Sequence, residues 1–111
     1  MNVPPYWMLR QYWPVYSWMI ERLIQLEQFH PDAQLTSWYR GERHNADVGG
    51  NPFSQHLLGF AFDLTAKNPP GLAATAQGLG FVAVQEPSHV HLQSFPAGTI
   101  PHSVFSGQRR T

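Results

Sequence analysis

Residues 54–63 read Ser-Gln-His-Leu-Leu-Gly-Phe-Ala-Phe-Asp, and the prediction of the fold begins from this stretch. Phe60 and Phe62 are large and apolar, and the residue that follows each of them is small or polar. This alternation predicts a strand over 59–65 with both phenylalanines in the core. Asp63 then faces the opposite, open side of the strand. Because aspartate is depleted from strands, its carboxylate indicates a functional role.

The segment before this strand carries a second polar side chain, His56, at the end of a loop. Gly59 lies between His56 and Asp63 and lets the backbone turn sharply there. Ala61 leaves space beside the two side chains. Imidazole and carboxylate are both zinc ligands, so this short stretch offers two donors to a metal.

A second stretch, residues 86–92, reads Glu-Pro-Ser-His-Val-His-Leu and has the same alternation. A strand over 88–94 places His89 and His91 on one face and the apolar side chains on the other. With those apolar side chains in the core, both imidazoles face the same cleft as Asp63. Two imidazoles and one carboxylate form a three-ligand zinc site with a fourth position open, which is the pattern of catalytic zinc.

Composition limits the classes of function. With no cysteine among 111 residues, a metal site must use His, Asp or Glu. Seven Lys and Arg balance seven Asp and Glu without a basic patch, so we expect no nucleic-acid partner. No apolar run is long enough to cross a bilayer, and the N-terminal segment lacks the pattern of a signal peptide. We therefore expect no membrane insertion.

The rest of the chain predicts a single α+β domain over residues 1–111, with a small antiparallel sheet and helices packed on one side. Apolar residues at helical spacing predict a helix that starts at Pro14. The expected elements are an irregular lead-in over 1–13, a helix over 14–29, strands over 34–39, 59–65, 80–85 and 88–94, a loop over 40–55 with a short helix near Asn45, a helix over 70–78, and an irregular tail over 96–111.

Three ordered blocks of this sequence resemble the zinc D-alanyl-D-alanine carboxypeptidase family. The blocks are Thr-Ser-Trp-Tyr-Arg at 36–40 followed by Asn45 and Val-Gly-Gly at 48–50, Ser-x-His-x-x-Gly-x-Ala-x-Asp at 54–63, and His-x-His at 89–91. That family includes the L-alanyl-D-glutamate endopeptidases of phage endolysins and the metal-binding domain of hedgehog proteins. The resemblance covers about residues 34–93 and implies a fold like theirs.

The resemblance implies a zinc cofactor held by His56, Asp63 and His91. One alternative stays open, because Glu86-x-x-His89 also has the spacing that some relatives use for the base and the third ligand. We favour His91 as the ligand, since Val-His-Leu around it resembles the ligand strand of short family members. On this interpretation the protein with His89→Ala keeps zinc and the protein with His91→Ala does not.

The resemblance also assigns residues to the reaction. Arg40 is expected near the metal, where it steadies the substrate carbonyl or carboxylate. Glu86 is the first choice for the group that carries the proton, and His89 is the second. Ser54 and Tyr39 are expected to contact the substrate, and Ser54 also to hydrogen-bond near His56. The sequence departs from the family at Trp38, where the family has a small glycine, and a reshaped cleft is the expected consequence.

These features predict a zinc peptidase that hydrolyses peptidoglycan stem peptides, as a D-Ala-D-Ala carboxypeptidase or an L-Ala-D-Glu endopeptidase. The short chain without a signal peptide resembles a phage-encoded member, which stays in the cytoplasm until release or belongs to the virion, and acts at the bacterial cell wall. One alternative is a catalytically inactive zinc-binding structural module of the same fold. Another is a phage tail component that docks on a virion partner through its aromatic N-terminus.

Overall fold

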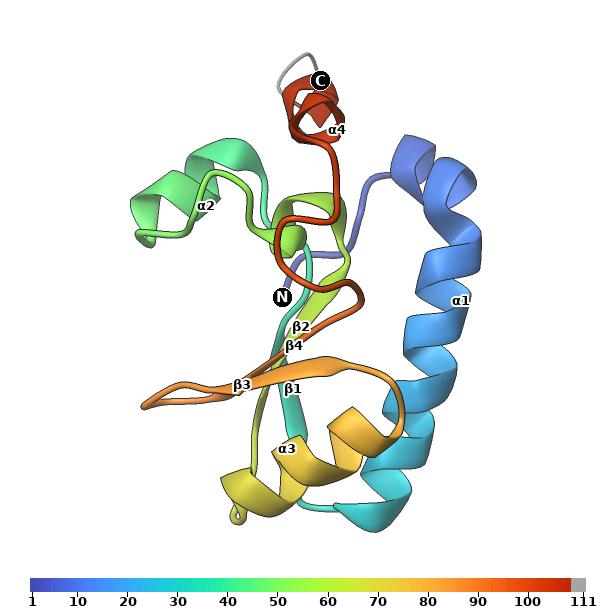
Figure 1. Ribbon diagram of the computed structural model, residues 1–111, viewed down its shortest axis with the longest axis vertical. Coiled ribbons are helices and arrows are strands. Elements are labelled where there is room, and N and C mark those ends of the chain that lie inside the picture. The colour runs from blue at the N-terminus through green and yellow to red at the C-terminus, as the bar shows by residue number, and fades with distance from the viewer. Residues whose placement is uncertain (109–111) are drawn as a thin grey trace.

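The computed structural model describes residues 1–108, with side chains through Phe105, and shows a four-stranded sheet with helices around it (Figure 1). The elements in chain order are α1 (Tyr6–Phe29), β1 (Gln34–Ser37), α2 (Glu42–Asp47), the short 3-10 helix η1 (Gln55–Leu58), β2 (Ala61–Thr65), α3 (Pro69–Gly78), β3 (Val82–Gln85), β4 (Val90–Gln93) and α4 (His102–Gln108). The predicted α+β class with an antiparallel sheet is confirmed.

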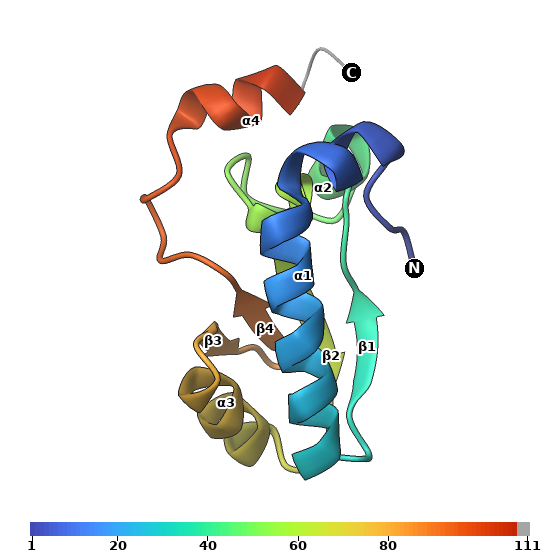
Figure 2. The same cartoon turned by 90° about the vertical axis from the view of Figure 1, so that its right-hand side faces the viewer.

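The sheet has the strand order β1-β2-β4-β3, and every neighbouring pair is antiparallel. Helices α1 and α3 pack against each other and α3 packs on β3 and β4 (Figure 2). Alternation along the two central strands buries Phe62, Leu64, Val90 and Leu92 in the core with α1 and α3. The side chains between them, Asp63 among them, face the other side of the sheet.

Helix α1 is longer than the sequence predicts. The expectation of an irregular lead-in is wrong for residues 6–13, which are helical, and it holds for the first five. Pro14 lacks the N–H that a helix interior needs, and the helix is kinked at Tyr12, whose φ and ψ are −113° and 16°. Pro14 therefore lies in the first turn after the kink. Along residues 1–108, no helix is both long and apolar enough to span a membrane.

The turn between η1 and β2 depends on Gly59. Its φ is +70°, in the left-handed region that glycine adopts without strain. A Cβ atom there would lie 2.8 Å from Cγ of Pro4 and 3.0 Å from the hydroxyl of Tyr16. Tyr16 is fully buried and donates a 2.7 Å hydrogen bond to the carbonyl of Leu58. Helix α1 and the N-terminal segment thus fix the backbone that leads into β2.

The C-terminal segment also differs from the prediction. The expectation of an irregular tail over 96–111 holds up to residue 101, is wrong for α4, and lies outside the described residues for 109–111. Phe105 is buried and packs edge-to-face on Phe53, whose ring stacks on His102 at 3.8 Å between centroids. These are contacts between distant parts of the chain, and the local sequence does not reveal them.

Candidate metal centre

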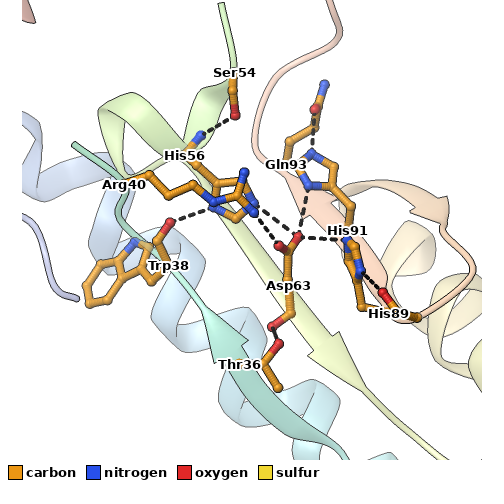
Figure 3. Close-up of polar contacts among 10 residues, drawn as sticks. Thr36, Trp38, Arg40, Ser54, His56, Asp63, His89, His91 and Gln93 are labelled. Carbon is orange, nitrogen blue, oxygen red and sulfur yellow. Dashed lines mark hydrogen bonds and ion pairs between the residues drawn. The ribbon is translucent and has the colours of Figure 1, made fainter. Parts of the chain in front are cut away.

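Three polar side chains from three different elements converge on one face of the sheet (Figure 3). His56 comes from η1, Asp63 from β2 and His91 from β4. Oδ1 of Asp63 lies 3.0 Å from Nε2 of His56 and 3.1 Å from Nδ1 of His91. One donor atom from each residue lies within 4.8 Å of the other two.

The sheet register places two of these side chains together. Asp63 and His91 are direct partners across the antiparallel pair β2–β4, so their side chains leave the same face of the sheet as neighbours. His56 reaches the same point because Ser54 caps η1, with its hydroxyl accepting a 3.2 Å hydrogen bond from the backbone N–H of His56. Gly59 then turns the chain into β2.

The candidate metal centre buries ionisable side chains that are usually exposed to solvent. His56 and Asp63 are almost completely buried, and His91 is partly exposed. Burial alone would raise the pKa of Asp63, but hydrogen bonds with His56 and His91 outweigh it and hold this pKa well below its usual range. Burial would lower the pKa of His91, but its bonds to Asp63 and Gln93 reverse that shift and raise it.

The remaining nitrogen of each imidazole is committed to an acceptor. Nδ1 of His56 lies 2.5 Å from the backbone carbonyl of Trp38, which can only accept, so this nitrogen carries the hydrogen. Nε2 of His91 lies 2.8 Å from Oε1 of Gln93 and donates to it. In the neutral rings, Nε2 of His56 and Nδ1 of His91 therefore carry lone pairs. Both lone pairs point at Asp63.

With both rings neutral, three electron-rich atoms would therefore meet with no hydrogen between them, whereas a protonated ring would hydrogen-bond Asp63. Such an arrangement repels itself unless a cation lies among the three atoms or an imidazole takes up a second proton. Ligands of a tetrahedral zinc with bonds of about 2.1 Å lie ~3.4 Å apart. The separations of 3.0 and 3.1 Å are close to this value. All three donor atoms lie within 4.8 Å of one another, so these side chains could hold a zinc ion after a small adjustment.

Arg40 occupies the other oxygen of the central carboxylate. Its guanidinium donates a 2.9 Å hydrogen bond to Oδ2 of Asp63, while its backbone N–H donates to the carbonyl of His56. This pairing leaves Oδ1 as the oxygen that faces the two imidazoles. Arg40 thus orients Asp63 and links η1 to the end of β1.

The three side chains open into a cleft of about 830 Å³. Ser54, Glu86 and His89 also line it. Nε2 of His89 lies 3.6 Å from Oδ1 of Asp63, so His89 and His91 do share one face of the sheet. The backbone N–H of Glu86 donates to the carbonyl of His89, which closes the hairpin between β3 and β4 and sets both side chains at the cleft.

Two residues lie elsewhere than the sequence analysis expected. Tyr39 lines a different hollow, beside the N-terminal segment and α2, and is not among the described residues that line the cleft of the metal centre. Trp38 does not reshape the cleft, because its ring is buried against Tyr16 and Phe62. Its indole N–H donates a 2.7 Å bond to the carbonyl of Gly59, and its own carbonyl orients His56.

Other parts of the site were not predicted from the sequence. Gln93 is hydrogen-bonded to His91. This contact could have been predicted, because residues two apart on a strand such as β4 lie on the same face. The wall formed by residues 96–105, with Ile100 and Phe105 in the lining, is a second omission. Nothing in the local sequence marks this wall, since it depends on packing between α4 and the loop before η1.

Comparisons with known proteins give one match. Neither the curated proteins nor the solved structures contain a match to this chain. The family model described as Peptidase M15 matches residues 18–93, which include every residue of the candidate metal centre described above and stop before the wall at 96–105. The chain therefore belongs to the peptidase M15 family of metallopeptidases.

Proposed function

We propose that this protein is a zinc-dependent peptidase that hydrolyses stem peptides of bacterial peptidoglycan. The observation that carries the proposal is the convergence of two imidazole lone pairs and one carboxylate oxygen at the edge of an open cleft. Family membership supports peptide hydrolysis, and the resemblance to the D-alanyl-D-alanine carboxypeptidases supports the substrate. The proposal covers both D-Ala-D-Ala carboxypeptidase action and L-Ala-D-Glu endopeptidase action.

His56, Asp63 and His91 would hold the metal in this proposal. Zinc would supply a Lewis acid that polarises the scissile carbonyl and acidifies the attacking water. Because the lone pairs of both rings already point inward, the ligands need little rearrangement to bind. Arg40 keeps Asp63 oriented and lines the cleft, which supports a role in steadying a substrate carbonyl or carboxylate.

The proton carrier is proposed to be Glu86 or His89, because both line the cleft beside the third ligand. Glu86 is exposed at its edge, and a carboxylate there can accept a proton from water and return it to the leaving amine. His89 lies closer to the ligands and is held by Ser88, whose hydroxyl is 2.9 Å from Nδ1. His89 therefore also suits a hydrogen bond to the developing oxyanion.

Ser54 is proposed to contact the substrate from the opposite wall, since it lines the cleft beside His56. No substrate contact is proposed for Tyr39, which lies outside this cleft. A phage origin, either as a lysis enzyme or as a virion component that thins the wall, is part of the proposal and rests on the resemblance alone.

Digestion of cell-wall material tests this function. The purified protein is incubated with peptidoglycan fragments and synthetic stem peptides, with and without a zinc chelator, and products are identified by mass spectrometry. We expect release of terminal D-Ala or cleavage between L-Ala and D-Glu, lost on chelation and restored by zinc. Glu86→Gln and His89→Ala should lower the rate with zinc retained, and Glu27→Gln, an exposed position on α1, serves as the control.

Two results would count against the proposal. Products that form equally well with the chelator would contradict a metal-dependent reaction. A zinc-loaded protein that gives no product from several wall types would favour the inactive structural module of the same fold instead.

A further inference from the structure

Gln93, the last residue of β4, makes two hydrogen bonds in opposite senses. Its Oε1 lies 2.8 Å from Nε2 of His91, and its Nε2 donates a 2.9 Å bond to the carbonyl of Phe95. The two ends of one carboxamide thus connect an imidazole of the candidate metal centre to a backbone carbonyl. No role in the reaction described above uses this residue.

The Phe95 carbonyl determines which way this carboxamide points. A carbonyl oxygen can only accept a hydrogen bond, so the NH₂ group of Gln93 must face Phe95. The carboxamide oxygen must then face His91, and Nε2 of His91 must carry the hydrogen between them. Nδ1 of the neutral ring is left with the lone pair, directed at Asp63.

The Phe95 peptide group is itself held in place. The side chain of Gln55 donates a 2.6 Å bond to the Phe95 carbonyl and accepts a 3.2 Å bond from the Phe95 N–H. Gln55 is buried and directly precedes His56. On the N-terminal side of Phe95, Ser94 donates both its backbone N–H and its hydroxyl to the carbonyl of Phe60.

These contacts form one continuous path between two of the three ligands. From His56 the path runs through the adjacent Gln55 to the Phe95 peptide group, then to Gln93 and His91. At each hydrogen bond along this path, only one choice of donor atom and acceptor atom agrees with the neighbouring bonds. The path therefore ties the tautomer of His91 to the position of η1.

We propose that Gln93, braced through Phe95 by Gln55, is a positioning residue that holds His91 in the Nε2–H tautomer so that Nδ1 is the atom that binds the metal. The inference rests on the metal centre of the proposed function, and it does not depend on which bond the enzyme cuts. Partners of this kind beside a metal ligand typically contribute about 10–100-fold to metal affinity.

Two substitutions separate positioning from mere packing. Gln93→Leu removes the acceptor for His91 and the donor to Phe95. Gln93→Glu keeps an acceptor for Nε2 of His91, because either carboxylate oxygen can accept, but it loses the donor to Phe95 and adds a negative charge. Gln34→Leu changes an exposed glutamine on the edge strand β1 and serves as the matched control.

The readouts are zinc affinity, measured by competition with a chromophoric chelator, and long-range ¹H–¹⁵N spectra of the histidine rings. We expect Gln93→Leu to weaken zinc binding about 10–100-fold, while Gln93→Glu and Gln34→Leu stay within about threefold of wild type. In wild type and Gln93→Glu, the spectra should show the Nε2–H tautomer of His91, both in the zinc-loaded protein and in the neutral ring of the metal-free protein.

Equal loss of zinc affinity in Gln93→Leu and Gln93→Glu would overturn the proposal, because it would show that only the bond to Phe95 matters. Zinc on Nε2 of His91, or the Nδ1–H tautomer in wild type, would also overturn it. The spectra of wild type and Gln93→Glu decide the matter even if Gln93→Leu does not fold. Failure of the proposed function would look different, as zinc bound through Nδ1 with no peptide cleaved.

Discussion

Single hydrogen bonds decide the chemistry of this site. The neutral imidazoles of His56 and His91 present different nitrogens to Asp63, because a backbone carbonyl holds one ring and a carboxamide holds the other. The same two residue types with the opposite hydrogen placement would present N–H groups and repel a cation. In the proposed metal centre, Trp38 and Gln93 would therefore matter as much as the candidate ligands themselves.

The buried hydroxyl of Tyr16 gives a prediction at the same scale. Tyr16→Phe removes the donor to the Leu58 carbonyl and leaves that acceptor buried beside η1. We expect a loss of about 1–3 kcal/mol in the free energy of unfolding, measured by urea denaturation. Tyr6→Phe, on a side chain 73% exposed at the start of α1, is the control and should change stability little. Equal values for the two variants would show that the buried bond contributes nothing.

At the scale of elements, the turn from η1 into β2 gives a second prediction. Gly59→Ala imposes the left-handed conformation on a residue with a Cβ and forces that atom against Pro4 and Tyr16. The conformation costs roughly 1–2 kcal/mol, and the crowding adds about 1–3 kcal/mol. Gly98→Ala is the matched control, because its φ is +79° and nothing lies within 4 Å of the added atom.

Urea denaturation of the two glycine variants separates the two costs. We expect the free energy of unfolding to fall by roughly 1–2 kcal/mol in Gly98→Ala, which is the cost of the left-handed conformation alone. In Gly59→Ala it should fall by about 1–3 kcal/mol more, because of the crowding. If both variants lose the same stability, the close approach of α1 to this turn is not what requires glycine at position 59.

The elements that carry the ligands could be predicted, because their patterns are local. Alternation placed Asp63 and His91 on the open faces of two strands, and the structure pairs them directly. The N-terminal part of α1 was missed because the prediction started the helix at Pro14, although a proline is also tolerated after a kink within one. Helix α4 was missed because the burial of Phe105 depends on a distant loop.

In the candidate site, too, the residues within local motifs could be predicted, and the contacts that depend on the folded chain could not. The convergence of His56, Asp63 and His91 and the position of Arg40 beside them could be predicted from spacing and from resemblance. The expectation for Tyr39 came from the resemblance alone, and the structure places this residue beside the N-terminal segment and α2 instead of in the cleft. The carbonyl of Trp38 left no signal, since any residue carries one.

At the scale of the whole molecule, the sheet serves to bring distant positions of the chain together. The three candidate ligands come from η1, β2 and β4, and Arg40 follows β1, so the candidate centre forms only when the sheet is assembled (Figure 3). A metal bound there would connect segments 35 residues apart in the chain, from position 56 to position 91. Zinc binding should therefore stabilise the entire fold and not only the cleft.

Zinc titration of wild type, His91→Ala and His89→Ala, with bound zinc and the thermal midpoint recorded together, tests the central claim most directly. We predict one zinc per chain in wild type and in His89→Ala. The midpoint should rise, since a ligand at 100 times its dissociation constant adds about 2.7 kcal/mol. His91→Ala should bind no stoichiometric zinc and show no rise. Stoichiometric zinc in His91→Ala, or none in wild type, would contradict the account.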